Sequence, residues 1–249
     1  MENSIKVVSI VGPTASGKTN LSVELAKHFN GEIVSADSMQ IYSGMQIATA
    51  KPTKAEMDGV PHHMMGFLPP DKTYSVASYV NDASKCIADI HSRGMLPFIV
   101  GGTGLYVDSL LNNISFSDDK RDEEYCSRLR KIGEEEGADK LLDMLSKFDP
   151  ESAERLRDGK NIKRIIRAIE FYKTTGKTIT EQIKESHNVP SPYSAVKIGL
   201  NCRDRQVLYD RINRRVDIML EEGLLEETQR VINSVNSRDN SDFTRSEKK

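Results

Sequence analysis

Short apolar runs alternate with amphipathic stretches in the first thirty residues. Residues 5–11 (IKVVSIV) form an apolar run that ends at a Gly-Pro pair, which is typical of a buried parallel strand. Residues 18–29 then carry Leu21, Leu25 and Phe29 at four-residue spacing. This spacing predicts a helix with a single apolar face.

The alternation continues over the next seventy residues. We expect a second strand at 32–35, a helix over 75–92 that closes at Gly94, and a third strand at 96–100. Strands that alternate with helices predict an α/β fold, in which a parallel sheet is covered by helices on both faces.

The pattern changes after residue 116. Residues 117–193 are highly charged and have helical periodicity with few strand signals, which predicts a helical insertion. Residues 196–201 (VKIGLN) have the pattern of a strand that returns to the sheet. We therefore assign residues 1–116 and 194–232 to one α/β core, interrupted by the insertion.

The last part of the chain begins as a helix and becomes polar. Residues 209–232 are amphipathic and are interrupted near Gly223, so we expect a helix or a pair of helices. Residues 233–249 have few large apolar side chains, which is typical of an irregular polar tail.

Charge and cysteine usage exclude several classes of protein. The 35 Lys and Arg residues and 37 Asp and Glu residues give a net charge of −2, which excludes a globally basic nucleic-acid coat but permits a local basic patch. The three cysteines are widely separated, so neither a disulfide framework nor a zinc ribbon is indicated. No apolar run reaches the roughly 18 residues that span a bilayer. We expect a cytoplasmic monomer with no membrane partner.

The segment between the first strand and the first helix matches a phosphate-binding loop. It reads GPTASGKT, which fits G-x-x-x-x-G-K-[ST] in the strand-to-helix context that the motif requires. Backbone N–H groups and the helix N-terminus bind phosphate oxygens, the lysine adds a cation, and the last hydroxyl can bind Mg²⁺. The predicted phosphate-binding residues are Gly12, Pro13, Thr14, Ala15, Ser16, Gly17, Lys18 and Thr19. The fold is therefore expected to be P-loop NTPase-like.

Two further polar residues follow predicted strands. Asp37 comes after the second strand, where a carboxylate faces the phosphate loop and can hold a metal or accept a proton. A helix cap formed by Asp37 or Ser38 is an equally good interpretation. Thr103 follows the third strand in a Gly-Gly-Thr-Gly segment, and it is either a ligand-binding hydroxyl or an N-cap.

Two other groups have bland and functional interpretations. His62 and His63 follow Pro61 in an expected loop. Adjacent side chains point in different directions, so we favour a structural or surface role over shared metal binding. Residues 155–173 hold seven basic residues against two acidic ones. An isoleucine stripe leaves the basic side chains off the buried face, so this helix is either a solvated surface or a polyanion-binding site.

Several motifs together resemble the tRNA dimethylallyltransferase family. These are GPTASGKT, SADSMQIYSGMQIATAKPT, GVPHH, YSVASYV, LPFIVGGTGLY, NIKRIIRAIEFYKTTGKTITE and LYDRINRRVDIML. They occur in the family's order and spacing and cover about residues 5–232. Members of this family usually continue for a further helical region, so the resemblance also suggests that the chain lacks the usual C-terminal part.

The resemblance implies a reaction and its residues. The reaction transfers a dimethylallyl group from dimethylallyl diphosphate to N6 of the adenosine beside the anticodon in tRNA, with Mg²⁺ as cofactor. The resemblance implies that Asp37 is the general base and that Thr103 lies beside the target base. It also implies that Lys18, Thr19 and Arg215 stabilise the diphosphate, and that Thr19 binds Mg²⁺. The implied tRNA contacts are Asp37, Ser38, Met39, Gln40, Thr103, Lys163, Arg164, Ile165, Ile166 and Arg167. The insertion would then be a tRNA-binding domain.

Three other functions are compatible with parts of the sequence. A relative that prenylates free adenine nucleotides would need no basic insertion. A small-molecule kinase shares the phosphate loop, but the third strand ends in Gly-Gly where a Walker-B aspartate would stand. The third alternative is an inactive truncated remnant that binds diphosphate or RNA without turnover.

Overall fold

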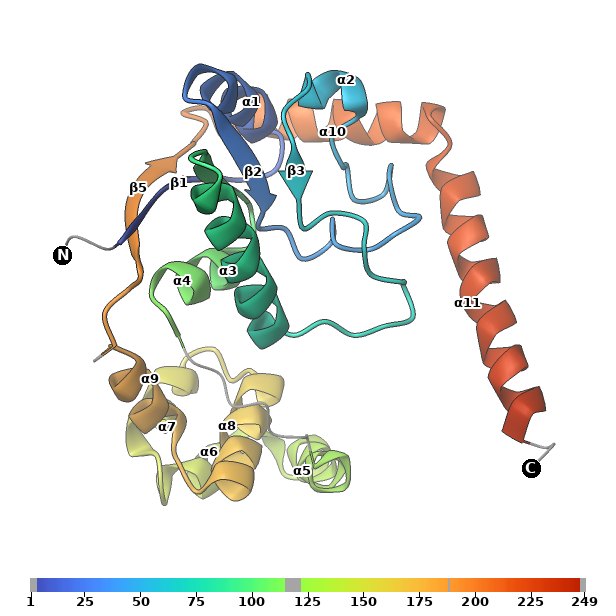
Figure 1. Ribbon diagram of the computed structural model, residues 1–249. Helices are drawn as coiled ribbons and strands as arrows, with labels where there is room; N and C mark the ends of the chain where they lie inside the picture. Colours follow the sequence, from blue (N-terminus) through green and yellow to red (C-terminus); the bar gives the residue numbers. More distant parts are fainter. Residues whose placement is uncertain (1–3, 115–121, 188, 247–249) are drawn as a thin grey trace. The chain divides into compact units, whose positions relative to one another are not determined.

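The computed structural model describes residues 4–114, 122–187 and 189–246, and its chain folds into two compact units (Figure 1). The first unit comprises Met1–Leu111 and Ser191–Lys249, and the second comprises Asn112–Pro190. The second unit thus begins and ends a few residues earlier than the insertion that we expected at 117–193.

The first unit is built on a five-stranded parallel sheet. Its strands are β1 (Ile5–Val11), β2 (Gly31–Ser35), β3 (His62–His63), β4 (Leu96–Gly101) and β5 (Tyr193–Gly199). Their order across the sheet is β3-β2-β4-β1-β5, and each neighbouring pair is parallel. The expected α/β fold class is confirmed.

Helices cover both faces of this sheet (Figure 1). These are α1 (Lys18–His28) on one face and α3 (Val76–Ser92) and α4 (Gly104–Leu111) on the other. The first unit also contains α2 (Lys54–Met57), α10 (Arg205–Glu221) and α11 (Leu224–Ser246). Alternate strand residues enter separate cores, since Ile10 packs with α1 residues whereas Val7 packs with α3 and α4 residues. This alternation follows from the two-residue period of a strand.

The second unit is helical and has a core of its own. Its helices are α5 (Glu123–Glu135), α6 (Gly137–Ser146), α7 (Pro150–Arg157), α8 (Ile162–Thr175) and α9 (Ile179–His187). Leu129, Leu141, Leu145 and Ile165 from three of these helices are all buried. The helical character expected from the charged, periodic sequence is therefore present.

The structure differs from the sequence expectations at three places in the first unit. β5 begins at Tyr193 instead of residue 196, because it pairs with β1 over the whole of Ile5–Val11. His62 and His63, expected in a loop, pair with β2 as the edge strand β3. Helix α11 continues to Ser246, where we expected an irregular tail from residue 233, because a helix satisfies its own backbone hydrogen bonds even where the sequence is polar.

Across the described ranges, none of the helices is both long enough and apolar enough to cross a membrane.

A buried carboxylate connects the edge strand to the rest of the sheet. Glu32 on β2 accepts hydrogen bonds from Arg93 Nη1 at 2.5 Å and Nη2 at 2.8 Å, and its Oε2 lies 2.6 Å from His63 Nε2. These bonds, those from Arg93 first, outweigh the effect of burial and lower the pKa of Glu32 to about 2. Glu32 therefore stays ionised and links β2, β3 and the end of α3.

Replacing Glu32 should destabilise the first unit and change its response to acid. We expect Glu32→Gln to cost ~1–3 kcal/mol of unfolding free energy at pH 7, because Arg93 and His63 lose a charged partner. Because the pKa of Glu32 is lower in the folded chain than its ordinary value of 4.5, ionised Glu32 stabilises the fold fully at pH values above 4.5. This contribution is lost as the pH falls toward 2. Urea unfolding at several pH values measures both effects.

The matched control for this prediction is Glu24→Gln, at an exposed position of α1. Equal unfolding free energies for the two variants at pH 7 would contradict the proposed role of Glu32.

Candidate active site

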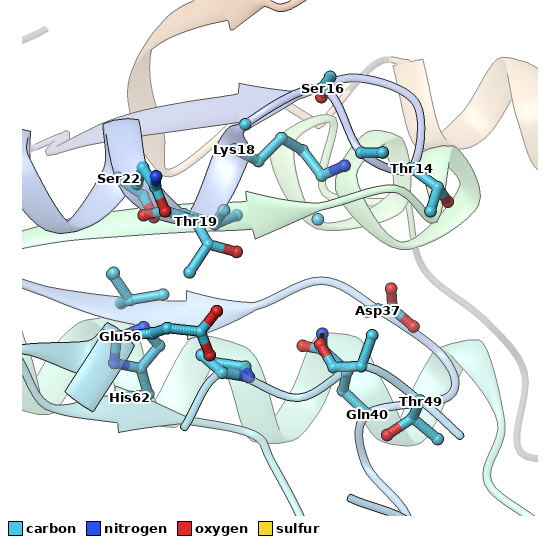
Figure 2. Close-up of a pocket in the computed structure, with 18 of the residues that line it drawn as sticks. Thr14, Ser16, Lys18, Thr19, Ser22, Asp37, Gln40, Thr49, Glu56 and His62 are labelled. Atoms are coloured by element: carbon cyan, nitrogen blue, oxygen red, sulfur yellow. Dashed lines mark hydrogen bonds between the residues drawn. The ribbon is translucent and has the colours of Figure 1, made fainter. Parts of the chain in front are cut away.

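A cavity of about 350 Å³ lies at the carboxyl ends of β1, β2 and β4. Figure 2 shows Ser16, Lys18 and Thr19 on one wall, and Asp37, Gln40, Thr49, Glu56 and His62 on the other. The first wall is the phosphate loop that follows β1, and the second is formed by segments after β2. Ligands of parallel α/β sheets bind at this edge.

The backbone of the phosphate loop depends on its two glycines. Gly17, just before α1, has φ of 89°, which side-chain-bearing residues rarely adopt. A Cβ at Gly12 would lie 2.6 Å from the carbonyl oxygen of Leu200, so only glycine fits between β1 and the end of β5. The loop therefore curls tightly in front of the N-terminus of α1, which favours an anion there.

Two side chains of the loop are suited to a phosphate ligand. Lys18 Nζ donates to the carbonyl oxygens of Gly12 at 2.9 Å and Pro13 at 2.7 Å. Burial lowers the pKa of Lys18, the charge of Asp37 opposes this effect, and Arg215 adds to it. The buried Ser16 Oγ has no hydrogen-bond partner within the described residues, and it lines the cavity. An unpaired buried hydroxyl is costly unless a ligand or water satisfies it.

The carboxylate of Asp37 lines the cavity beside this loop. Its Oδ1 accepts a hydrogen bond from the Met39 backbone N–H at 2.9 Å, which stabilises a turn after β2. No helix begins at this turn in the described chain, so the helix-cap interpretation of Asp37 is wrong. The remaining capacity of the carboxylate is directed to the cavity (Figure 2).

Thr103, in the segment between β4 and α4, holds this turn in place. Its Oγ1 accepts a hydrogen bond from the Ser38 backbone N–H at 3.0 Å, and its own N–H donates to the Ala36 carbonyl at 3.1 Å. Thr103 is not among the residues that line the cavity. Its hydroxyl thus acts on the turn that carries Asp37.

Arg215 reaches the cavity from helix α10. Its Nη2 donates to the Ala50 carbonyl at 3.3 Å, and the Gln40 side chain donates to the same oxygen at 3.3 Å. The cavity is therefore lined by two cationic groups, Lys18 and Arg215, and by the carboxylates of Asp37 and Glu56. The predicted residues Ser38 and Met39 belong to the turn, but they do not line the cavity.

Sequence reasoning missed several residues of the second wall. Thr49 and Ala50 belong to a loop with no strand or helix signal. Glu56 forms a capping box with Thr53, a sequence signal for a helix start that gives no hint of a cavity. His62 also lines the cavity, its Nδ1 lies 2.8 Å from the Val60 carbonyl, and burial lowers its pKa. His63 has the structural role that we favoured, through Glu32.

The residues predicted to contact tRNA on the insertion lie on helix α8 of the second unit. Lys163, Arg164 and Arg167 line a cavity of about 500 Å³ within that unit. Ile165 and Ile166 are buried in its core, where their side chains cannot contact RNA. The sequence pattern already places the isoleucines on the apolar stripe, so the helical period separates them from the basic residues.

The described residues contain no group of three or more His, Cys, Asp or Glu side chains that could hold a metal ion. Oxygen ligands nevertheless line the cavity, among them Thr19 and Asp37. Mg²⁺ is commonly held by few protein ligands together with phosphate oxygens. The donors present fit such an ion better than an all-protein metal centre.

Comparison with known proteins relates the whole of this arrangement to one family. The model of the IPP transferase family matches residues 40–246, and that of isopentenyl transferase matches residues 5–65. A tRNA dimethylallyltransferase from Halalkalibacterium halodurans is 51% identical over 226 residues, which are 91% of this chain and 71% of that protein.

Solved structures agree with these sequence matches. The tRNA isopentenylpyrophosphate transferase of Bacillus halodurans is 48% identical, with a TM-score of 0.63 over 92% of this chain and 70% of its own. A eukaryotic dimethylallyltransferase that acts on tRNA is 31% identical, with a TM-score of 0.76 over 94% of this chain and 57% of its own. The chain, with its phosphate loop and its carboxylate at one edge of a parallel sheet, belongs to the IPP transferase family.

Proposed function

We propose that this chain transfers the dimethylallyl group of dimethylallyl diphosphate to N6 of the adenosine next to the anticodon in tRNA and releases diphosphate. The observation that carries the proposal is that a phosphate loop and the Asp37 carboxylate line a single cavity. Membership of a family of diphosphate-utilising prenyltransferases supports the same conclusion.

The proposed reaction makes two demands on the protein. The N6 amine of adenine attacks C1 of the dimethylallyl group, the C1–O bond breaks, and its electron pair leaves with the diphosphate. The amine is a poor nucleophile, so its proton must be removed during attack. The departing diphosphate gains negative charge, which must be neutralised.

The residues of the cavity are suited to both demands. Asp37 accepts the N6 proton, and Lys18 and Arg215 neutralise the charge that develops on the diphosphate. The Ser16 hydroxyl, which has no partner among the described residues, and the N–H groups of the phosphate loop supply further hydrogen bonds to phosphate oxygens.

Mg²⁺ is the cofactor that we propose for this site. Thr19 would hold it together with diphosphate oxygens, in agreement with the oxygen donors of the cavity. When bound, the ion supplies positive charge to the leaving group.

The second unit supports a tRNA substrate over a free nucleotide. Lys163, Arg164 and Arg167 form a basic group on α8, and an adenine mononucleotide would not need it. For the reaction, the target base must leave the stacked anticodon and enter the cavity. A second set of RNA contacts, away from the cavity, would hold the tRNA while the base is unstacked. The kinase alternative is disfavoured because β4 ends at Gly101 without a Walker-B aspartate.

Asp37→Asn should impair the chemical step and leave donor binding intact. We expect the single-turnover rate to fall by about 10²- to 10⁴-fold, because the amide cannot accept the N6 proton. Rapid-quench transfer of labelled dimethylallyl to tRNA measures this rate. Asp108→Asn, at an exposed position of α4, is the control. An undiminished rate for Asp37→Asn would exclude Asp37 as the general base.

Lys18→Met should weaken stabilisation of the diphosphate. We expect kcat/KM for dimethylallyl diphosphate to fall by about 10²-fold or more, since a cation at the leaving group is lost. Steady-state kinetics at saturating tRNA measure the change. Lys6→Met on β1, where the side chain is exposed, should behave as the unmodified chain; a similar fall in both variants would point to a general loss of stability.

Lys163→Glu and Arg164→Glu should weaken tRNA binding and make it less sensitive to salt. Each lost phosphate contact should reduce the slope of log K against log salt by about 1. Fluorescence anisotropy at several salt concentrations measures this slope. Lys147→Glu, an exposed position at the end of α6, is the control, and three equal slopes would argue against α8 as a tRNA contact.

The decisive experiment offers labelled dimethylallyl diphosphate and Mg²⁺ to unmodified tRNA and, separately, to AMP. Label in tRNA is the expected result. Label in AMP alone would replace the proposal by a free-nucleotide prenyltransferase. Absence of label in both, with a folded chain, would refute the proposed activity, and phosphoryl transfer from ATP would then test the kinase alternative.

A further inference from the structure

A buried carboxylate outside the cavity holds one of its loops. The side chain of Glu227 on α11 is 5% exposed and accepts hydrogen bonds from three consecutive backbone N–H groups. Gln46 N donates to Oε2 at 2.8 Å, Ile47 N lies 3.0 Å from Oε1 and 2.9 Å from Oε2, and Ala48 N donates to Oε1 at 2.9 Å. Both oxygens of the carboxylate are engaged.

The charge of Glu227 is stabilised at this buried position. Burial acts to raise the pKa of Glu227, but the three N–H groups and the nearby Lys51 ammonium outweigh it, and the pKa is lowered. Lys51 is itself only 8% exposed and donates to the Tyr42 carbonyl. Losing one of these hydrogen bonds would leave a buried charge without a partner, which costs free energy. The carboxylate and the loop therefore fix each other's position.

The loop that Glu227 holds has its other side in the cavity. Thr49 and Ala50 line the cavity, and the Ala50 carbonyl accepts the hydrogen bonds from Arg215 and Gln40. Short bonds inside the loop, including Ala50 N to the Ile47 carbonyl at 2.8 Å, connect its two sides. A shift of the N–H groups of residues 46–48 would therefore move the acceptor of Arg215.

Helices α10 and α11 each form side-chain hydrogen bonds with this loop. Arg215 comes from α10 and Glu227 from α11, and the two helices follow each other at Gly223 (Figure 1). Glu227 does not line the cavity and therefore has no direct role in the proposed reaction.

We propose that Glu227 is a positioning residue, which anchors the loop of residues 46–50 so that Arg215 and Ala50 are held in place for the diphosphate. The inference rests on the proposed function only for the identity of the ligand, because the geometry concerns the diphosphate end of the cavity. Through its three N–H contacts the carboxylate acts on Arg215 and does not touch the substrate.

Glu227→Gln is the test variant, because glutamine presents one acceptor oxygen where the loop has three donors. We expect the dissociation constant of Mg²⁺-pyrophosphate, measured by isothermal titration calorimetry on the full chain, to rise by about 10- to 100-fold. The KM for dimethylallyl diphosphate should rise in parallel. Mere loss of folded protein would lower the apparent kcat and leave KM unchanged.

Glu226→Gln is the matched control, since Glu226 is exposed on the same helix. It should bind pyrophosphate as the unmodified chain does. If Glu227→Gln is too unstable to purify, Glu227→Asp supplies the test, because it keeps the charge and shortens the reach by one methylene. A folded Glu227 variant with unaltered pyrophosphate affinity would overturn the inference.

A double-mutant cycle with Arg215→Ala tests the route of the effect. If Glu227 acts through Arg215, the double variant should bind pyrophosphate no more weakly than Arg215→Ala alone. Losses that multiply would overturn the inference. Pyrophosphate binding does not require prenyl transfer, so a chain that shows this coupling without modifying tRNA would refute the proposed function and leave the positioning role supported.

Discussion

Parallel pairing of β1, β4 and β2 is the constraint on which the candidate site depends. Val11 is in register with Gly101, and Ser35 is in register with Val100, so the three strands end within about a residue of one another. The segments that follow them therefore leave the sheet at a single edge. Thr103 then joins two of these segments through Ala36 and Ser38. The phosphate loop and Asp37 face each other because the backbone ladder places them so.

The site brings charged groups of both signs into one cavity. Lys18 and Arg215 line it together with the carboxylates of Asp37 and Glu56. Partial burial strengthens the interactions among these groups compared with the same groups in water. The cations suit a leaving group that gains negative charge, and the carboxylate suits a nucleophile that must lose a proton. A single polar cavity can thus serve both ends of a group transfer.

Glu227 and Glu32 show two uses of a buried carboxylate in the same unit. Glu32 pairs with the side chains of Arg93 and His63 and secures an edge strand. Glu227 instead binds three backbone N–H groups and orders a loop that has no regular secondary structure. A single carboxylate thus holds residues 46–48, while Arg215 and Gln40 bind the same loop at the Ala50 carbonyl. The structure of the cavity therefore also depends on a residue that does not line it, Glu227.

Much of the fold and part of the site could be predicted from the sequence, because their signals are local. The apolar run at residues 5–11, the glycines of the phosphate loop and the stripe on α8 each specify structure through neighbouring residues. These patterns predicted the α/β class, the phosphate loop and a helical second unit. The position of Asp37 left a catalytic role and a helix cap open, and the family resemblance favoured the catalytic role and implied one for Arg215.

The rest was decided by tertiary structure, because it depends on residues far apart in the chain. The order of the strands, the pairing of β3 and the start of β5 follow from contacts between separate segments. His62 enters the cavity only because β3 joins the sheet edge, and Glu227 meets residues 46–48 across about 180 positions. Helical periodicity placed Glu227 on an amphipathic helix but could not identify its partners, since its burial depends on contacts with residues far away in the sequence.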